Sequence, residues 1–256
     1  MSTKGATQRK TEWFVDLNER YYDRQFEEPY RSTVAFCEWL ERKSLLSKHR
    51  RQRILDVGTG KGANILYMGK RYSRSEFVGL DINPRLIAER NVVLRRNLIR
   101  NCSLIRGDLY RLRKSEVGHI DGVVSYQTLS WLPDYRKPLA GICRLGPRWI
   151  AATSLFYEGL VNARIEVEEF SKGLGGRVKK CYYNIYSLPI LKEFLHHHGY
   201  QRVFFTPFEI DIDLPRPRSR LMSTYTENLI GGRRQQISGP LLMSWYFVAA
   251  VRNDSQ

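Results

Sequence analysis

The chain has few cysteines and no long apolar run, and both absences narrow the class of protein. Only 4 of its 256 residues are cysteine, and Cys37, Cys102, Cys143 and Cys181 lie far apart, without the close spacing of metal ligands. We therefore expect ordinary thiols of a cytoplasmic protein and no metal site. No apolar run reaches the roughly eighteen residues that span a bilayer, so we expect no transmembrane helix.

The sequence also lacks internal repeats and low-complexity segments, which favours a single domain. The N-terminal MSTKGATQRK is polar and basic with no apolar stretch behind it, so we expect no secretory signal and a disordered tail over residues 1–11. Residues 12–256 have a suitable length for one domain. Within it we expect an N-terminal helical cap over residues 12–49 and two substrate-side insertions, over residues 159–187 and 211–240.

Acidic residues are the minority among the charged ones. The chain has 42 Lys and Arg against 26 Asp and Glu, a formal net charge of +16. Such a surface attracts nucleic acid, anionic lipid headgroups or phosphorylated substrates. Part of this charge has a simpler explanation, because the arginines of residues 85–100 share a helical pattern with apolar residues, as on the outer face of a helix that covers a sheet. Polyanion binding through the basic surface stays an open alternative.

Glycine is concentrated at one place, the stretch ILDVGTGKGANIL over residues 54–66. Gly58, Gly60 and Gly62 alternate directly after a short apolar strand, and a helical pattern follows them. Glycine is favoured where φ is positive or where another group approaches the main chain closely. A strand, a tight turn and a helix in this order would direct free backbone N–H groups into the space where open α/β sheets bind ligands.

Polar residues follow each of the next three predicted strands. The strand over residues 77–80 ends in Asp81, the one around residues 104–105 is followed by Asp108, and the one around residues 123–124 is followed by Ser125-Tyr126-Gln127. An acidic residue at the end of the second strand is typical of ribose binding. Further strands are predicted over residues 148–156, 202–214 and 244–252, and helices over residues 13–26, 29–46 and 135–145. The pattern predicts an α/β fold with a doubly wound, seven-stranded, mostly parallel sheet that ends in a reversed hairpin.

The glycine order G-x-G-x-G differs from the G-x-G-x-x-G of dinucleotide sites. Together with Asp81, Asp108 and the segment VVSYQTLSWLPD, it resembles the first motifs of the class I S-adenosylmethionine-dependent methyltransferases. The resemblance is close over residues 50–160 and looser elsewhere. It implies a Rossmann-like methyltransferase fold and S-adenosyl-L-methionine as the cofactor.

Position by position, the resemblance implies a set of cofactor-binding residues: Asp56, Gly58, Thr59, Gly60, Gly62, Asp81, Ile82, Asp108, Leu109 and Gln127. The glycines would line the methionine part of the cofactor, with Asp56 orienting their loop. Asp81 would bind the ribose and Ile82 would lie against the adenine. Asp108 and the main chain of Leu109 would meet the adenine amino group, and the glutamine would lie near the sulfonium. In this family an N-terminal helical segment often covers the cofactor, which adds Tyr21, Tyr22 and Arg31 as possible contacts.

The reaction of such an enzyme needs a general base only where the acceptor must lose a proton. Candidates for this role are Tyr157 and Glu158, which follow the fifth predicted strand, and then Tyr126 and His119. The three consecutive histidines at residues 196–198 are not metal ligands in our interpretation. Neighbouring residues of a helix point about 100° apart, so the three side chains cannot converge on one ion. Gly199 behind them indicates a helix end.

The acceptor is indicated less directly. The segment QTLSWLPDYRKPL resembles the equivalent region of small-molecule methyltransferases of the trans-aconitate and quinone-biosynthesis kind, and the D/N-P-P-Y/F signature of base N-methyltransferases is absent. We expect a small-molecule or sugar-type acceptor, anionic in view of the arginines, with Trp131, Tyr225, Arg233 and Arg234 as substrate-binding candidates. An RNA methyltransferase is the first alternative. An NAD-dependent oxidoreductase and a non-catalytic binding protein are alternatives from other classes.

Overall fold

The computed structural model describes residues 26, 28–88, 99–174, 178–216, 218, 223–241 and 243–253. The predicted tail, nearly all of the helix predicted over residues 13–26, and Tyr21 and Tyr22 lie outside the described residues, as does most of the pattern over residues 85–100. Helix α2 (Arg31–Arg42) corresponds to the second predicted helix of the N-terminal cap.

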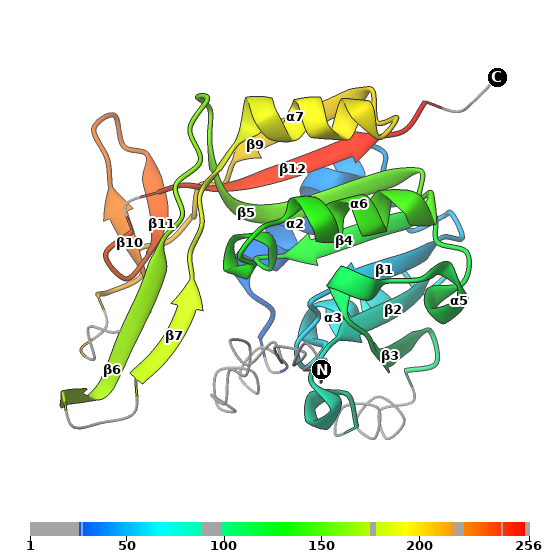
Figure 1. The fold of residues 1–256 in the computed structure, drawn as a ribbon, viewed down its shortest axis with the longest axis horizontal. Helices are drawn as coiled ribbons and strands as arrows, with labels where there is room; N and C mark the ends of the chain where they lie inside the picture. The colour runs from blue at the N-terminus through cyan, green and yellow to red at the C-terminus, as the bar shows by residue number, and fades with distance from the viewer. Residues whose placement is uncertain are drawn as a thin grey trace, which may run out of the picture.

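A central sheet runs through the whole molecule (Figure 1). Its strands are β1 (Arg53–Val57), β2 (Glu76–Asp81), β3 (Cys102–Arg106), β4 (Gly122–Tyr126), β5 (Trp149–Tyr157), β9 (Arg202–Pro207) and β12 (Trp245–Val251). They lie in the order β3-β2-β1-β4-β5-β12-β9, and the two-residue strand β8 (Tyr186–Ser187) pairs with β5. Strands β1 to β5 pair in parallel, and β12 is antiparallel to both neighbours. The predicted doubly wound sheet is confirmed, although the strand predicted over residues 202–214 ends at Pro207.

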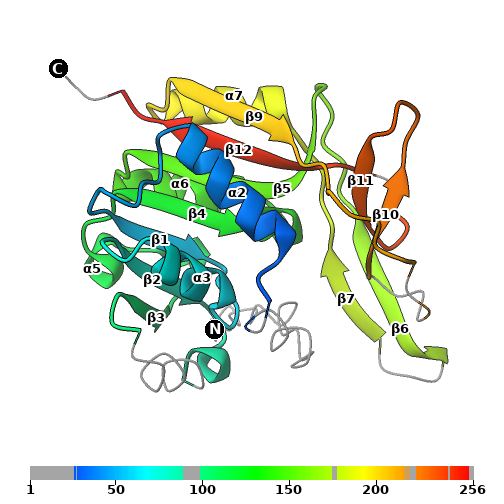
Figure 2. The same cartoon turned by 180° about the vertical axis from the view of Figure 1, so that it is seen from behind.

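Helices cover both faces of the sheet (Figures 1 and 2). Helices α2 and α3 (Ala63–Arg71) lie on one face, whereas α6 (Arg136–Leu145), α7 (Leu188–His197) and the short α5 (Lys114–Val117) lie on the other. Two 3-10 turns, η1 (Leu109–Arg111) and η2 (Leu129–Trp131), follow β3 and β4. In the part of the chain that the structure describes, no helix combines the length and the apolar character needed to cross a bilayer.

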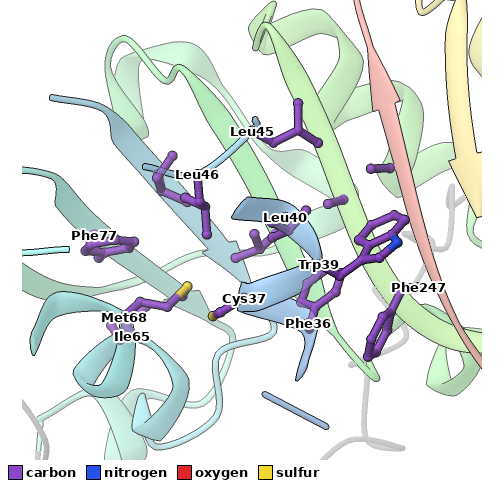
Figure 3. Close-up of a cluster of buried hydrophobic side chains, with 14 of the residues drawn as sticks. Phe36, Cys37, Trp39, Leu40, Leu45, Leu46, Ile65, Met68, Phe77 and Phe247 are labelled. Atoms are coloured by element: carbon purple, nitrogen blue, oxygen red, sulfur yellow. The ribbon is translucent and has the colours of Figure 1, made fainter. Parts of the chain in front are cut away.

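The core consists of two apolar layers, one on each side of the sheet. On the first side, one face of α2 packs its aromatic residues against β12, with the ring centroid of Phe247 5.1 Å from that of Phe36 and 5.8 Å from that of Trp39 (Figure 3). On the second side, α6 and α7 bury residues such as Ile142 and Leu191 against β4 and β5. Burial on both faces explains why the strands of this sheet read as continuous apolar runs.

Two hairpins extend beyond the carboxyl ends of the parallel strands (Figures 1 and 2). Strands β6 (Glu166–Leu174) and β7 (Val178–Tyr182) form the first, within residues 159–187. Strands β10 (Thr224–Asn228) and β11 (Arg234–Ser238) form the second, around Gly231 and Gly232 as predicted. Both glycines have positive φ, 86° and 77°, as a tight hairpin turn requires.

A buried polar network fixes the base of the first hairpin to the turn that follows β4. The Asn184 side chain is fully buried. Its Nδ2 donates to the carbonyl oxygen of Leu132 at 2.7 Å, and its Oδ1 accepts from the backbone amide of Ile165 at 2.9 Å. The backbone amide of Asn184 donates to the Ser130 carbonyl at 2.8 Å. The Ser130 hydroxyl, hydrogen-bonded to that of Ser154, accepts from the Leu155 amide at 2.9 Å. Because buried polar groups are costly to leave unpaired, this network holds the hairpin base in one position.

Replacing Asn184 with leucine tests this anchor. The Asn184→Leu variant keeps the branched shape of the side chain but leaves the Ile165 amide without its partner, so we expect the free energy of unfolding to fall by about 2 to 4 kcal/mol. Urea unfolding measures this difference. Asn228→Leu, at an exposed position of β10, is the matched control and should change stability by about 0.5 kcal/mol or less. Equal stability of the two variants would show that the network is not an anchor.

Candidate active site

The carboxyl ends of β1 and β4 lie side by side at the point where the strand order reverses. Open α/β sheets bind their ligands at this position. Here the hydroxyl of Thr128 donates to the carbonyl oxygen of Val57 at 3.2 Å and so joins the two strand ends. A Cβ atom on Gly58 would lie 2.4 Å from the Thr128 Oγ1, and its φ is +72°. Glycine at position 58 is therefore required by both backbone conformation and space.

The glycine loop is held by β2. The amides of Gly58 and Thr59 both donate to the carbonyl oxygen of Leu80, at 2.9 and 3.2 Å, and the amide of Gly60 donates to the carboxylate of Asp81 at 2.9 Å. The sequence prediction that this loop offers free amides is wrong at these three positions, because the neighbouring strand uses them. The three glycines of the loop all have positive φ, between 57° and 79°, which is the conformation that the prediction required.

Asp56 lies beneath this loop and is fully buried. Its Oδ2 accepts a hydrogen bond from the Thr59 hydroxyl at 2.7 Å, and its Oδ1 has no hydrogen-bond partner among the described residues. Burial, together with the nearby charge of Asp81, raises the pKa of Asp56 to about 7, against an opposing effect of the Thr59 hydrogen bond. A carboxyl with this environment is typical of a functional site.

Asp81 is the second carboxyl at this edge and is half-buried. Besides the Gly60 amide, it accepts a hydrogen bond from the Asn83 amide at 2.9 Å. Burial raises the pKa of Asp81 even though these backbone hydrogen bonds favour its charged form. A carboxylate has about four acceptor positions, so capacity for further hydrogen bonds remains. Ile82, half-buried, follows it directly.

Asp108 follows β3, which pairs with β2, and it caps the turn η1. Its Oδ1 accepts from the Tyr110 amide at 2.9 Å. Asp108 and Leu109 are both half-buried, and the register places Arg106, at the end of β3, beside Asp81. The predicted acidic residues after β2 and β3 therefore lie at the same edge of the sheet.

The three polar residues after β4 point in different directions. Ser125 is buried on the α6 and α7 side of the sheet. Tyr126 points to the other layer, where its hydroxyl lies 3.5 Å from the Cys37 sulfur, and burial raises its pKa well above the usual value. Gln127 has a positive φ of 54°, uncommon for a residue other than glycine, at the edge itself. Strained backbone of this kind clusters at functional sites.

The predicted base candidates after β5 are exposed at the carboxyl edge. The Tyr157 side chain is 45% exposed. The Glu158 carboxylate accepts a hydrogen bond at 2.8 Å from Tyr246, whose pKa is raised to about 12 by burial and by this carboxylate. Tyr246 therefore donates a proton to the hydrogen bond at neutral pH. Nothing in the sequence around Tyr246 indicated this contact, because it joins residues from two distant strands.

Tyr126 and His119 are wrong as candidates for the general base. The hydroxyl of Tyr126 lies between the Cys37 and Met68 sulfur atoms, within the core layer. His119 precedes β4 and contacts Asp121 at 3.4 Å, so it lies at the amino edge of the sheet, away from the glycine loop.

The predicted substrate residues lie in different surroundings. Trp131 is half-buried, with its ring centroid 4.9 Å from that of Tyr183 at the base of the first hairpin. In the second hairpin, Tyr225 is buried and its hydroxyl donates to the Gly239 carbonyl at 3.1 Å. Two further members of the set are already in ion pairs, Arg233 with Glu209 at 2.7 Å and Arg234 with Asp213 at 3.2 Å.

The histidines at residues 196–198 end α7, as predicted. The Nδ1 atoms of His197 and His198 lie 2.8 and 2.9 Å from the carbonyl oxygens one turn earlier, and Gly199 follows with a φ of +88°. Within the described ranges of the chain, no group of three or more His, Cys, Asp or Glu side chains has the arrangement of a metal site.

Comparisons with known proteins agree with this architecture. The model of a methyltransferase domain matches residues 54–145, from β1 to the end of α6. Three solved structures share the fold over most of both chains. A precorrin-6y C5,15-methyltransferase from Geobacter metallireducens is 12% identical, with 86% of this chain and 87% of that chain covered and a TM-score of 0.50.

The YcgJ protein from Bacillus subtilis is 9% identical, with 87% and 100% covered and a TM-score of 0.52. A SAM-dependent methyltransferase from Aquifex aeolicus is 14% identical, with 91% and 97% covered and a TM-score of 0.52. A search of curated proteins gave no match. At these identities the solved structures show a shared fold, and the domain model adds the activity. The domain match spans the glycine loop, Asp81 and Asp108 on a sheet of the same architecture, so the chain carries an S-adenosylmethionine-dependent methyltransferase domain over residues 54–145.

Proposed function

We propose that this methyltransferase acts on a small-molecule or sugar-type acceptor of anionic character, in the cytoplasm. One observation carries the proposal: the Asn184 network fixes the first hairpin to the turn after β4, directly beside the edge where the glycine loop lies. A rigidly held element at the carboxyl edge suits a pocket for a small acceptor, since substrate contacts usually lie on loops positioned by a rigid scaffold. An RNA acceptor is less favoured, because Arg233 and Arg234 on this side already pair with carboxylates.

The residues at the edge fit the cofactor expected from the family. All three glycines of the loop have the positive φ that glycine favours, and Asp81 retains acceptor capacity for ribose hydroxyls. Asp56 positions the loop through Thr59, and Gln127 presents a strained backbone at the end of β4. We assign Ile82 to the adenine face and Asp108 with Leu109 to its amino group.

S-adenosylmethionine supplies an activated methyl group, so the protein has mainly to hold the acceptor atom in line. Glu158 is the preferred general base if the acceptor must lose a proton, because its carboxylate is exposed at the edge and Tyr246 orients it. Tyr157, beside it, is the second candidate. The aromatic pair of Trp131 and Tyr183 offers a face for a ring-bearing acceptor. Tyr225, Arg233 and Arg234 stay as predicted substrate residues of the second hairpin.

The cofactor assignment predicts the behaviour of Asp81→Ala. Loss of charged hydrogen bonds to the ribose should weaken binding of S-adenosylmethionine and of its demethylated product by about 2 kcal/mol, or roughly thirtyfold. Isothermal titration calorimetry measures both affinities. Glu76→Ala removes a carboxylate from the opposite end of the same strand and should bind both ligands as the native chain does. Native affinity in Asp81→Ala would remove the residue from the cofactor site.

The raised pKa of Asp56 predicts a pH dependence of stability. Its folded pKa of about 7 lies above the ordinary value of 3.8, so the folded protein holds a proton that the unfolded chain releases between these values. The stability contribution is therefore largest below pH 4 and is lost as pH rises toward 7. Asp56→Asn does not ionise, so its unfolding free energy relative to the native chain should rise between pH 5 and pH 8.

Urea unfolding of the native protein and the variant at several pH values in this interval checks the sign. Because the charge of Asp81 raises the pKa of Asp56, the difference reports the titration of the interacting pair, and its expected sign stays the same. A difference that stays constant with pH would mean that Asp56 is charged in the folded protein throughout.

The acceptor class is tested by incubating the protein with radiolabelled S-adenosylmethionine and separate pools of RNA, metabolites, glycans and lipids. We expect label in a low-molecular-weight anionic fraction. With that acceptor, Trp131→Ala should raise the Michaelis constant about tenfold or more and leave cofactor affinity within about twofold, because the lost contact touches one of two ligands.

The double variant Arg233→Ala/Arg234→Ala tests which of the two hairpins binds the acceptor. A similar rise in the Michaelis constant would place the acceptor's charged group at the second hairpin, whereas no rise would confine the pocket to the first. Incorporation of label into RNA alone would overturn the small-molecule proposal.

A further inference from the structure

The amino ends of the strands form the sheet edge opposite the glycine loop, and arginines stand along it. In the order of the sheet, Arg74 precedes β2, Arg51 precedes β1, Arg148 precedes β5, Arg252 follows β12 and Arg202 begins β9. We call these five residues the edge row. The strand order therefore brings residues that are far apart in the sequence to one edge of the sheet, the edge at the right side of Figure 1.

The backbone fixes the spacing of the edge row. Neighbouring strands lie about 4.8 Å apart, so the row from β2 to β9 extends over about 24 Å. One direct contact connects two of its members, since the Arg252 amide donates to the Arg148 carbonyl at 2.9 Å; the Arg74 guanidinium is held by the His49 carbonyl at 3.2 Å. The row is therefore long enough to contact several phosphates of one nucleic-acid strand.

The positive charge of the edge row is not neutralised. All five side chains belong to exposed residues, and none has a carboxylate within 4.0 Å among the residues that the structure describes. The nearby acids are occupied, since Glu76 pairs with Arg53 at 2.8 Å and Asp121 accepts from the Arg53 amide. Further exposed cations flank the row: Lys43, Lys48, Arg50 and Arg144.

The arginines at the other side of the molecule differ in this respect. Arg31 pairs with Asp211, Arg216 with Glu227, and the two arginines of β11 and its preceding turn with Glu209 and Asp213. Several arginines on the hairpin side are thus ion-paired, whereas the five arginines of the edge row are not, among the residues that the structure describes. Exposed guanidinium groups without partners bind phosphate oxygens well, with up to two hydrogen bonds each.

We infer that the edge row binds the phosphodiester backbone of a nucleic acid. A bilayer surface is less suited to it, because interfacial binding also needs apolar side chains that insert. The strongly exposed apolar residues Leu160, Val161 and Ile230 lie after β5 and between β10 and β11, beyond the carboxyl edge. A nucleic acid held at the edge row lies away from the glycine loop, so it locates the enzyme and does not serve as the methyl acceptor. This inference is independent of the acceptor proposed above.

The test uses the full chain and a fluorescent 20-nucleotide RNA of mixed sequence, with binding followed by anisotropy at several salt concentrations. The native protein should bind, with an affinity that falls steeply with salt. The variant Arg148→Gln/Arg202→Gln/Arg252→Gln should bind about tenfold more weakly or worse. Its slope of log affinity against log salt should be smaller by about 2, as expected for three lost phosphate contacts on a single strand.

A matched control removes the same number of charges elsewhere, at the exposed positions Lys137, Lys180 and Lys192, each replaced by glutamine. It should keep native RNA affinity and salt slope. Both variants should bind S-adenosylmethionine like the native chain, which shows that they fold. A parallel assay measures binding to phosphatidylserine vesicles. The inference is overturned if the native chain does not bind the RNA, if both variants lose RNA affinity equally, or if the edge-row variant binds the vesicles more weakly but the RNA as well as the native chain does.

Discussion

The hydrogen bond from the Gly60 amide to the Asp81 carboxylate is the contact on which the active site depends. It joins the loop after β1 to the end of β2, and the Leu80 carbonyl strengthens the same junction by accepting two further amides. This contact holds the half-buried Asp81 carboxyl near a second carboxyl, that of Asp56, and burial raises the pKa of both. The site thus keeps two carboxyls in an environment that disfavours their charge, as functional sites do at some expense of stability.

The turn after β4 extends this junction toward the acceptor side. Thr128 closes the space beside Gly58 and bonds to the end of β1, and two residues later Ser130 bonds to β5 and to the base of the first hairpin. One short segment therefore contacts both the glycine loop and the insertion. A shift of the insertion relative to the loop would break buried hydrogen bonds, so the distance between the two expected ligands is set by the scaffold and not by loop motion.

The sequence predicted those features that depend on local pattern and failed where the partner is distant. Apolar runs and the polar residues that end them gave the strands and the common edge of Asp81 and Asp108, and positive φ at the glycines followed from composition. The loop amides were predicted to be free because the Leu80 carbonyl, some twenty residues away, has no sequence signal. Ser125 and Tyr126 point to opposite core layers because side chains alternate along β4. The sequence prediction missed this because the helices on each face of β4 come from distant parts of the chain.

The net charge of the chain does not indicate where in the fold the arginines lie or which of them are ion-paired. A net charge of +16 is a property of the whole chain, yet the fold pairs several arginines near the hairpins with carboxylates, whereas the five arginines of the edge row have no such pair among the described residues. An ion-paired guanidinium beside a pocket offers a weaker field to an anionic acceptor than its residue type suggests, because the carboxylate competes for the same donors. The proposed acceptor would therefore depend more on aromatic and hydrogen-bonding contacts at the first hairpin, and the proposed nucleic-acid contact would depend on the long-range field of the opposite edge.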